Sequence, residues 1–227
     1  MTPHPHPCRP WARRPVAVAA AIALSTLLPA ASAAQKHWTF IGGCAAADWF
    51  GMLSGPNADG TLFCWSSTAG GPATAFPPLA GDDVFILLPN ASSTLLVEFA
   101  DPVRGNPTGQ AASLTMAGSS SHAVGLRMAR GSLVTGNLTL GSDGSARQGR
   151  LDLTVGTLSV TGTTSVFGGT LRQTGGSLVA PGRMLVASQA GTAAVELAGG
   201  TLLVGQLDVD ALGSGSASFS QLAGTLT

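Results

Sequence analysis

A short motif returns at a nearly regular interval along the second half of the chain, and a repeat restricts the possible folds more than any local pattern does. A small residue followed by leucine recurs six times, and glycine precedes the last five copies. The marker leucines are Leu114, Leu133, Leu158, Leu178, Leu202 and Leu226. Their spacing averages about 22 residues, which is typical of solenoids, in which each unit buries its apolar side against its neighbours.

Each repeat divides into three short runs. The first run contains the marker leucine and ends at a glycine shortly after it. The second reads NLTL, TTSV, RMLV and QLDV in successive repeats, and the third reads RLDLTV, TLRQT, AVELA and SFSQLA. Alternation of apolar and polar residues in such runs predicts β-strands, and this alternation together with the glycine content excludes helical repeats.

We therefore predict an all-β, right-handed parallel β-helix over residues 101–227, with three short strands and about 22 residues per coil. Coils stacked about 4.8 Å apart pair each strand with the coils on either side, and crossovers of this kind are right-handed. Leu202 then points inward and Leu203 outward, and the pair Gly199-Gly200 forms a corner between two strands. A β-sandwich is the alternative, but its hairpins have no reason to repeat with matched internal turns.

Residues 1–33 have the pattern of a secretory signal peptide. Arginines precede an apolar stretch over residues 16–28, and Ala31-Ser32-Ala33 fits a signal-peptidase site. We expect cleavage between Ala33 and Ala34 and export by the Sec pathway, because Arg13-Arg14 lacks the rest of a twin-arginine pattern. The apolar stretch is shorter than the roughly 20 residues of a membrane-spanning helix, and we expect no transmembrane segment in the mature chain.

Residues 34–100 differ from the repeats and are expected to form an N-terminal cap. They contain Trp38, Trp49 and Trp65 and most of the phenylalanines that follow the signal peptide. Such aromatic side chains either stack on sugar rings or close the open end of a solenoid, where core side chains would otherwise meet water. We favour the cap.

The two cysteines of the mature chain, Cys44 and Cys64, lie in the same region. In an exported protein we expect them to form a disulfide, which stabilises a loop of this length by about 3 kcal/mol. A metal or redox pair is the alternative, but no CxxC motif is present. The mature chain has one lysine, Lys36, and no basic cluster, so the charge pattern of a nucleic-acid binder is absent.

Catalytic chemistry on a β-helix requires carboxylates that converge on one site. The best constellation in the sequence is Asp208 with Asp210 on one strand face and Arg183 one coil earlier, and we interpret it as a solvated ion pair. His37 and His122 are the sole imidazoles of the mature chain, and no nucleophile elbow appears. We expect no enzyme activity and no cofactor.

Two acidic turns have the residue types of a calcium site. Asn57-Ala58-Asp59-Gly60 and Asp82-Asp83 carry oxygen ligands. We interpret both as turns in which side-chain oxygens accept hydrogen bonds from nearby backbone N–H groups. The sequence therefore predicts no metal site.

The pattern G-[ST]-L-x-V-x-G resembles the β-helical repeat regions of bacterial autotransporter passengers. It is also similar to exported Gram-negative proteins that carry PEP-CTERM sorting tails, and the stretch from Trp38 to Ile86 is similar to the segment that begins many such solenoids. The resemblance covers essentially the whole mature chain. It implies a secreted or cell-surface protein of a Gram-negative bacterium.

These observations predict a non-enzymatic β-helical protein that acts as an adhesin, passenger stalk or matrix scaffold. Its partner would be an extracellular ligand such as a glycan or a host or matrix surface. A polysaccharide-binding or polysaccharide-degrading protein, either a lyase or a glycoside hydrolase, is the alternative by fold analogy. Because the sequence stops as a new coil begins, we expect the chain to continue beyond Thr227 or a partner to cover its last coil.

Overall fold

The structure, a computed structural model, describes residues 33–40, 44, 49, 64–72, 77–99, 107–142, 144–211 and 213–227. All of them belong to the unit Ala33–Thr227. The expected signal peptide lies outside the described residues except for Ala33, and the turn Asn57-Ala58-Asp59-Gly60 lies outside them too.

The described residues are all-β, as predicted, and form fourteen strands. The first seven strands are β1 (Gln35–Trp38), β2 (Trp65–Ser66), β3 (Asp83–Leu87), β4 (Leu95–Phe99), β5 (Thr108–Ala117), β6 (Val124–Met128) and β7 (Ser132–Leu140). The other seven are β8 (Gly149–Leu153), β9 (Thr157–Val160), β10 (Thr164–Val166), β11 (Gly169–Gln173), β12 (Ser177–Ser188), β13 (Thr192–Ala211) and β14 (Ser216–Leu226).

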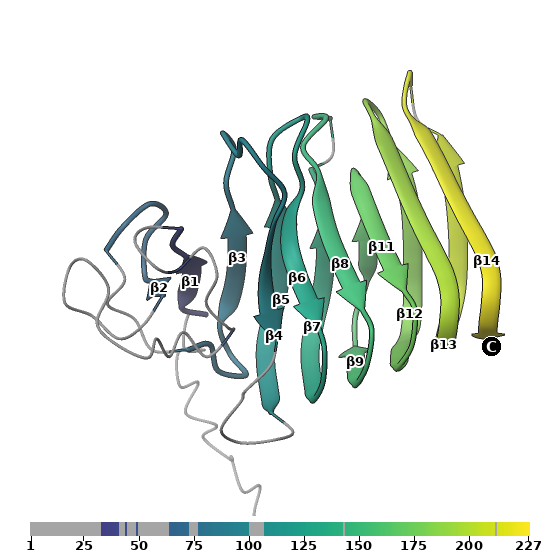
Figure 1. Cartoon of the computed structure of the whole chain (residues 1–227), viewed down its shortest axis with the longest axis horizontal. Helices are drawn as coiled ribbons and strands as arrows, with labels where there is room; N and C mark the ends of the chain where they lie inside the picture. The colour runs from purple at the N-terminus through teal and green to yellow at the C-terminus, as the bar shows by residue number, and fades with distance from the viewer. Residues whose placement is uncertain are drawn as a thin grey trace, which may run out of the picture. The chain divides into compact units, whose positions relative to one another are not determined.

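Parallel pairing stacks these strands into a β-solenoid of about five turns with ~24 residues per coil (Figure 1). Three faces run along the stack. The first face contains residues 108–111, 132–135, 157–160, 177–180 and 201–204. The second contains residues 83–87, 113–117, 137–140, 164–166, 183–188 and 206–211. The third contains residues 95–99, 124–128, 149–153, 169–173, 192–197 and 216–221.

One of the predicted marker leucines belongs to a different row. Leu114 pairs with Leu138 on the second face, and the residue in register with Leu133 is Gly109. The expectation that Leu114 begins the marker row was therefore wrong, and the short interval between Leu114 and Leu133 is not a coil length. Including this interval made the average leucine spacing shorter than the ~24 residues per coil of the structure.

The marker row itself forms part of a continuous apolar core. Leu133, Leu158, Leu178 and Leu202 are in register on the first face and fully buried, whereas Leu226 in β14 is 37% exposed. Full burial of a leucine side chain contributes about 1.5–3 kcal/mol. Inward rows of this kind on all three faces hold the stacked coils together.

The pair Gly199-Gly200 forms the predicted corner, between the third-face and first-face parts of β13. Gly200 has a φ of 77°, and a Cβ added there would lie 2.3 Å from the carbonyl oxygen of Gly176. A residue with a side chain can neither adopt this backbone conformation without strain nor fit against the coil below.

The predicted disulfide between Cys44 and Cys64 is present, with 5.5 Å between the two Cα atoms, and both cysteines are fully buried. Next to them, β1 pairs antiparallel with β2 and parallel with β3. The N-terminal region therefore joins the second face of the solenoid by a regular strand ladder.

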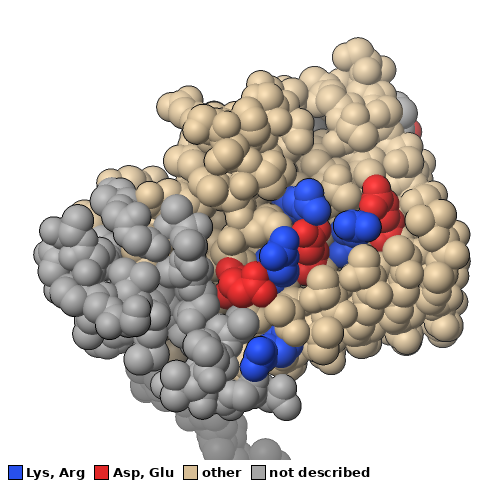
Figure 2. Space-filling model, viewed as in Figure 1, with Lys and Arg blue, Asp and Glu red and all other residues tan. Residues whose placement is uncertain are grey.

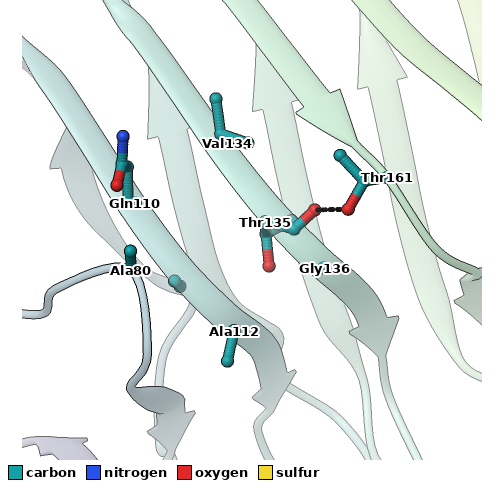
Figure 3. Close-up of a pocket in the computed structure, with 8 residues that line it drawn as sticks. Ala80, Gln110, Ala112, Val134, Thr135, Gly136 and Thr161 are labelled. Atoms are coloured by element: carbon teal, nitrogen blue, oxygen red, sulfur yellow. Dashed lines mark hydrogen bonds between the residues drawn. The ribbon is translucent and has the colours of Figure 1, made fainter. Parts of the chain in front are cut away.

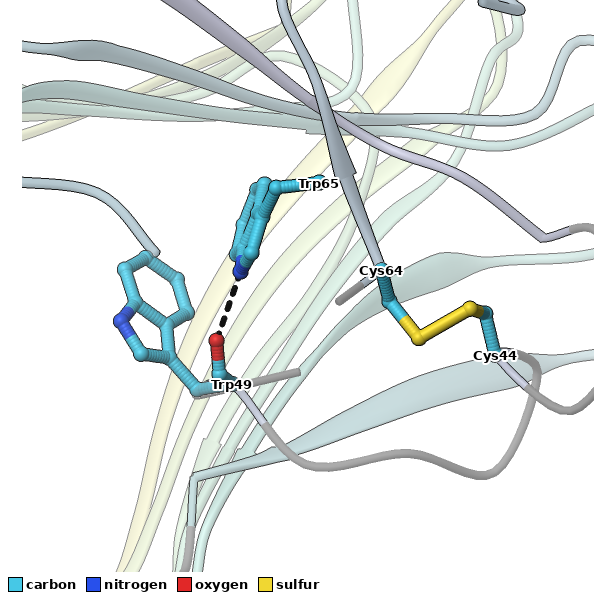
Figure 4. Close-up of a disulfide and its surroundings, with 4 residues drawn as sticks. All are labelled: Cys44, Trp49, Cys64 and Trp65. Carbon is cyan, nitrogen blue, oxygen red and sulfur yellow. Dashed lines mark hydrogen bonds between the residues drawn. A yellow bond between two sulfur atoms is a disulfide. The ribbon is translucent and has the colours of Figure 1, made fainter. Parts of the chain in front are cut away.

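The three tryptophans pack together, and Figure 4 shows Trp49 and Trp65 beside this disulfide. Trp65 contacts Trp38 and Trp49 edge to face, with ring centroids 4.9 and 5.2 Å apart, and its indole N–H donates to the carbonyl oxygen of Trp49 at 2.7 Å. Trp49 in turn packs on Phe99 of β4. All three tryptophans are buried, so their rings present no open face on which a sugar could stack.

Candidate functional site

A row of alternating charges runs across the third face. Glu98, Arg127, Asp152, Arg172 and Glu196 occupy the same register position on β4, β6, β8, β11 and β13. These five residues, called the charged strip below, point outward because their neighbours along each strand point into the core. Figure 2 shows alternating acidic and basic side chains on this surface.

The charges of the strip are paired at different distances. Nε of Arg150, which lies on β8 beside the strip, donates to Oδ1 of Asp152 at 2.9 Å. By contrast, Nη1 of Arg127 lies 3.9 Å from Oε2 of Glu98, and Nε of Arg172 lies 3.5 Å from Oε2 of Glu196. Surface ion pairs at such distances contribute about 0–1 kcal/mol to stability, so these two pairs add little to the folded state.

The middle of the charged strip borders a shallow hollow with a volume of about 300 Å³. We call it the arginine hollow, and it is lined by Arg127, Arg150, Asp152, Thr154, Arg172 and Thr174. The side chain of Asp152 is 9% exposed, whereas those of Arg127 and Arg172 are 49% and 50% exposed. The surface that a ligand meets there is therefore cationic, with the carboxylate at its base.

Glu98 has an unusual electrostatic environment at one end of the charged strip. Partial burial raises the pKa of its carboxyl group, although the positive charges of Arg127 and Arg130 oppose this shift. The negative charge of Asp152 raises the pKa of Glu98 further. Glu98 is thus easier to protonate than an ordinary surface glutamate.

The constellation singled out in the sequence forms the predicted ion pair on the second face. Arg183 of β12 donates from Nε to Oδ2 of Asp208 on β13, and both side chains are partly exposed. Hydrogen bonds from Gln206 and then Arg183 lower the pKa of Asp208. Asp210 lies two residues further along the same strand.

At Asp82-Asp83, the prediction holds for Asp82, which accepts from a nearby backbone N–H, whereas Asp83 accepts from a side chain on the adjacent strand β5. Oδ2 of Asp82 accepts from the backbone N–H of Leu79 at 2.9 Å, and Oδ1 of Asp83 accepts from the hydroxyl of Ser113 at 2.6 Å. Within the described ranges, no three His, Cys, Asp or Glu side chains converge as a group that could hold a metal ion.

The two histidines that the structure describes, His37 and His122, are not members of the charged strip. His37 on β1 stacks on Phe85 of β3, with ring centroids 4.8 Å apart, and burial lowers the pKa of its imidazole. Nδ1 of His122 lies 3.1 Å from the hydroxyl of Ser121, in the connection before β6. The contacts of the two rings in the described part of the chain are with Gln35, Phe85 and Ser121, none of which belongs to the charged strip.

A second hollow lies beside the first face (Figure 3). Its lining includes Gln110, Val134, Thr135 and Thr161 and carries no charged side chain. The hydroxyl of Thr161 donates to the carbonyl oxygen of Thr135 at 3.4 Å, which ties adjacent coils together. Because its lining has no charged group, this hollow can form fewer charge-assisted hydrogen bonds with a polar ligand than the arginine hollow can.

The charged strip was not predicted from the sequence, although the sequence contains a signal for it. Five of the six runs on the third face place a charged residue directly after an inward Val or Leu: Val97-Glu98, Leu126-Arg127, Leu151-Asp152, Leu171-Arg172 and Val195-Glu196. The last run has Ser220 after Phe219 instead. Aligning the runs on that inward residue brings the five charges into one row. Their alternation in sign becomes visible only in this alignment.

The chain matches no protein-family model, no curated protein and no solved structure. In the part of the chain that the structure describes, no helix has the length and apolar character needed to cross a membrane.

Proposed function

We propose that this protein is an exported, non-enzymatic β-solenoid that acts at the cell surface or in the extracellular medium as a scaffold binding an extended polymer. The observation that carries the proposal is the charged strip, in which five outward side chains follow one another on consecutive rungs. A surface that repeats with the coils suits a ligand that also repeats. A small substrate would need groups that converge on one point.

Export is supported by two independent features. The N-terminal residues have the pattern of a signal peptide, and the buried pair Cys44–Cys64 is a disulfide of the kind that persists in oxidising compartments. The buried tryptophan cluster supports a structural role for the N-terminal region, since its rings are used in packing.

The proposal is tested by expressing the full chain with an internal epitope tag in a Gram-negative host. We expect fractionation to recover it outside the cytoplasm, shortened at the N-terminus by mass spectrometry and with Cys44 and Cys64 oxidised. Purified protein should then bind immobilised extracellular polymers without releasing reducing ends. Retention in the cytoplasm with free thiols would contradict the export step, and failure to bind any polymer in a broad panel would contradict the scaffold.

A second candidate function is polysaccharide cleavage, and the environment of Glu98 favours it. A carboxyl group with a raised pKa suits a general acid. Asp152 lies two rungs away on the same strip, a separation of about 9.6 Å at about 4.8 Å per rung. This strand spacing is close to the upper end of the about 6.5–9.5 Å that separates the two carboxyl groups of inverting glycosidases. Release of reducing ends that is abolished in both Glu98→Gln and Asp152→Asn would replace the scaffold proposal with this one.

A further inference from the structure

We propose that the arginine hollow binds the carboxylate groups of an acidic polysaccharide that lies along the coil axis. The inference rests on the proposed scaffold function and names the chemical class of its ligand. It starts from the charge of the exposed lining, where three guanidinium groups surround one carboxylate that is 9% exposed. That carboxylate is already bound to Arg150, so the groups that remain accessible are mainly cationic.

Arg127 and Arg172 have unused hydrogen-bonding capacity. Charge-assisted N–H···O bonds are normally about 2.7–2.9 Å long, whereas these arginines lie 3.9 and 3.5 Å from their carboxylate neighbours. Neither guanidinium donates a hydrogen bond to any described residue at its present position. A planar guanidinium with free donors matches the two oxygens of a carboxylate in a bidentate contact.

Arg150 supplies a fixed positive charge between these two arginines. Its hydrogen bond to Asp152 holds the guanidinium over the floor of the hollow, so a ligand does not have to immobilise this side chain. Thr174 borders the same hollow and adds a hydroxyl group of the kind that contacts sugar hydroxyls. The hydroxyl of Thr154, also in the lining, donates to the carbonyl oxygen of Met128 at 2.9 Å and offers a ligand its acceptor side. The lining thus combines carboxylate recognition with neutral polar contacts.

The spacing of the arginines favours a polymer over a single acid. Arg127 lies on β6 and Arg172 on β11, with β8 between them, which corresponds to about 9.6 Å along the axis at about 4.8 Å per rung. An extended polyuronate presents carboxylates at regular intervals, so one chain can meet both arginines. Two linked weak contacts bind far more tightly than either alone.

The ion pair of Arg183 provides a matched control. Arg183 is 54% exposed and paired with Asp208 on the next coil, much as Arg172 is paired with Glu196. It differs in that it donates a hydrogen bond to its partner and does not line the arginine hollow. Arg147 does not line this hollow either. The double variant R147Q/R183Q therefore changes the net charge by the same amount as R127Q/R172Q.

The experiment measures binding of the exported full chain to immobilised polygalacturonate by biolayer interferometry, with dextran as the neutral polymer. We expect binding to polygalacturonate that weakens with salt, at least about tenfold weaker binding in R127Q/R172Q, and little change in R147Q/R183Q. Circular dichroism checks that each variant is folded. R127K/R172K keeps both charges and loses the guanidinium fork, so it should bind with intermediate affinity.

Three results would overturn the inference. These are absence of binding to polygalacturonate at low salt, equal loss of binding in R127Q/R172Q and R147Q/R183Q, and equally tight binding to dextran. The last result would leave the scaffold proposal intact, because the protein would still bind a polymer. If R127Q/R172Q does not fold, R127K/R172K decides: affinity equal to that of the unaltered protein would refute recognition by the arginine fork.

Discussion

The corner glycine Gly200 offers the sharpest test of how the coils are held together. Two separate costs oppose Gly200→Ala. The backbone has a φ of 77°, and a left-handed conformation costs a residue with a side chain about 1–2 kcal/mol. The new Cβ would also lie 2.3 Å from the carbonyl oxygen of Gly176, where ordinary contact begins at 3.4 Å. The two strands would have to separate by about 1 Å at this rung to restore ordinary contact.

Forcing extra atoms into close packing costs about 1–3 kcal/mol, so we expect Gly200→Ala to lose about 3 kcal/mol of stability in total. Three other glycines separate the two costs. Gly70 has a φ of 67° with nothing within 4 Å, Gly182 has an ordinary φ and a contact of 2.3 Å, and Gly81 has neither problem. Gly70→Ala should lower the free energy of unfolding by about 1.5 kcal/mol and Gly182→Ala should lower it by about 2 kcal/mol. Gly81→Ala should leave it nearly unchanged.

The assay combines urea unfolding, followed by far-UV circular dichroism, with hydrogen exchange. Solenoids unfold in part coil by coil, so the exchange experiment supplies a local measurement. The amide of Thr201 donates to the carbonyl oxygen of Gly176 at 3.0 Å, and its protection should fall in Gly200→Ala. If Gly200→Ala were no less stable than Gly81→Ala and the Thr201 amide kept its protection, the stacked-corner explanation would be refuted.

Three further predictions concern the N-terminal region and the end of the charged strip. Replacing Cys44 and Cys64 by serine should cost the N-terminal region about 3 kcal/mol, measured as an earlier transition in tryptophan fluorescence during urea unfolding. Glu98→Gln should become more stable relative to the unaltered protein as pH rises through and above 4.5. Because the pKa of Glu98 is higher in the folded protein than in the unfolded chain, its contribution to stability is fully present below the unfolded-state pKa and is lost as pH rises through the folded-state pKa. An unchanged difference between the urea midpoints of the two proteins at acidic and neutral pH would contradict this. His37→Gln should reduce the loss of stability on acidification below pH 6.5, because burial lowers the pKa of His37 and the unfolded chain binds the proton first. Thermal midpoints measured between neutral and mildly acidic pH test this, and parallel curves for the two proteins would count against it.

Most of the architecture was predictable because a solenoid repeats its local pattern. Leu133, Leu158, Leu178 and Leu202 could be aligned from their G-[ST]-L motif alone, and all four are buried in one row. The disulfide was predictable because two cysteines lie close together after the predicted cleavage site. Leu114 was misplaced because the first coil has Gly109 at the marker position and lacks the motif.

The candidate site was harder to predict because it depends on three strand runs being laid side by side. Arg127, Asp152 and Arg172 lie at unequal intervals in the chain, and the loops of different length between them hide their common register. Register decides which side chains meet, but it does not decide how deeply each is buried. That Asp152 is covered while Arg127 and Arg172 stay open depends on side-chain packing.

The sequence alone was enough to predict a β-solenoid, the positions of its glycine corners and the apolar side chains of its core. These properties follow from the alternation of apolar and polar residues along each strand and from the regular return of the glycine corners. Which charged residues become neighbours, and which of them face solvent, was settled only when the coils were stacked. Neighbours in a parallel stack are set by register between coils, and register depends on how every loop closes. The arginine hollow exists for that reason: three coils bring their charges to one place, and packing buries the acid beneath the arginines.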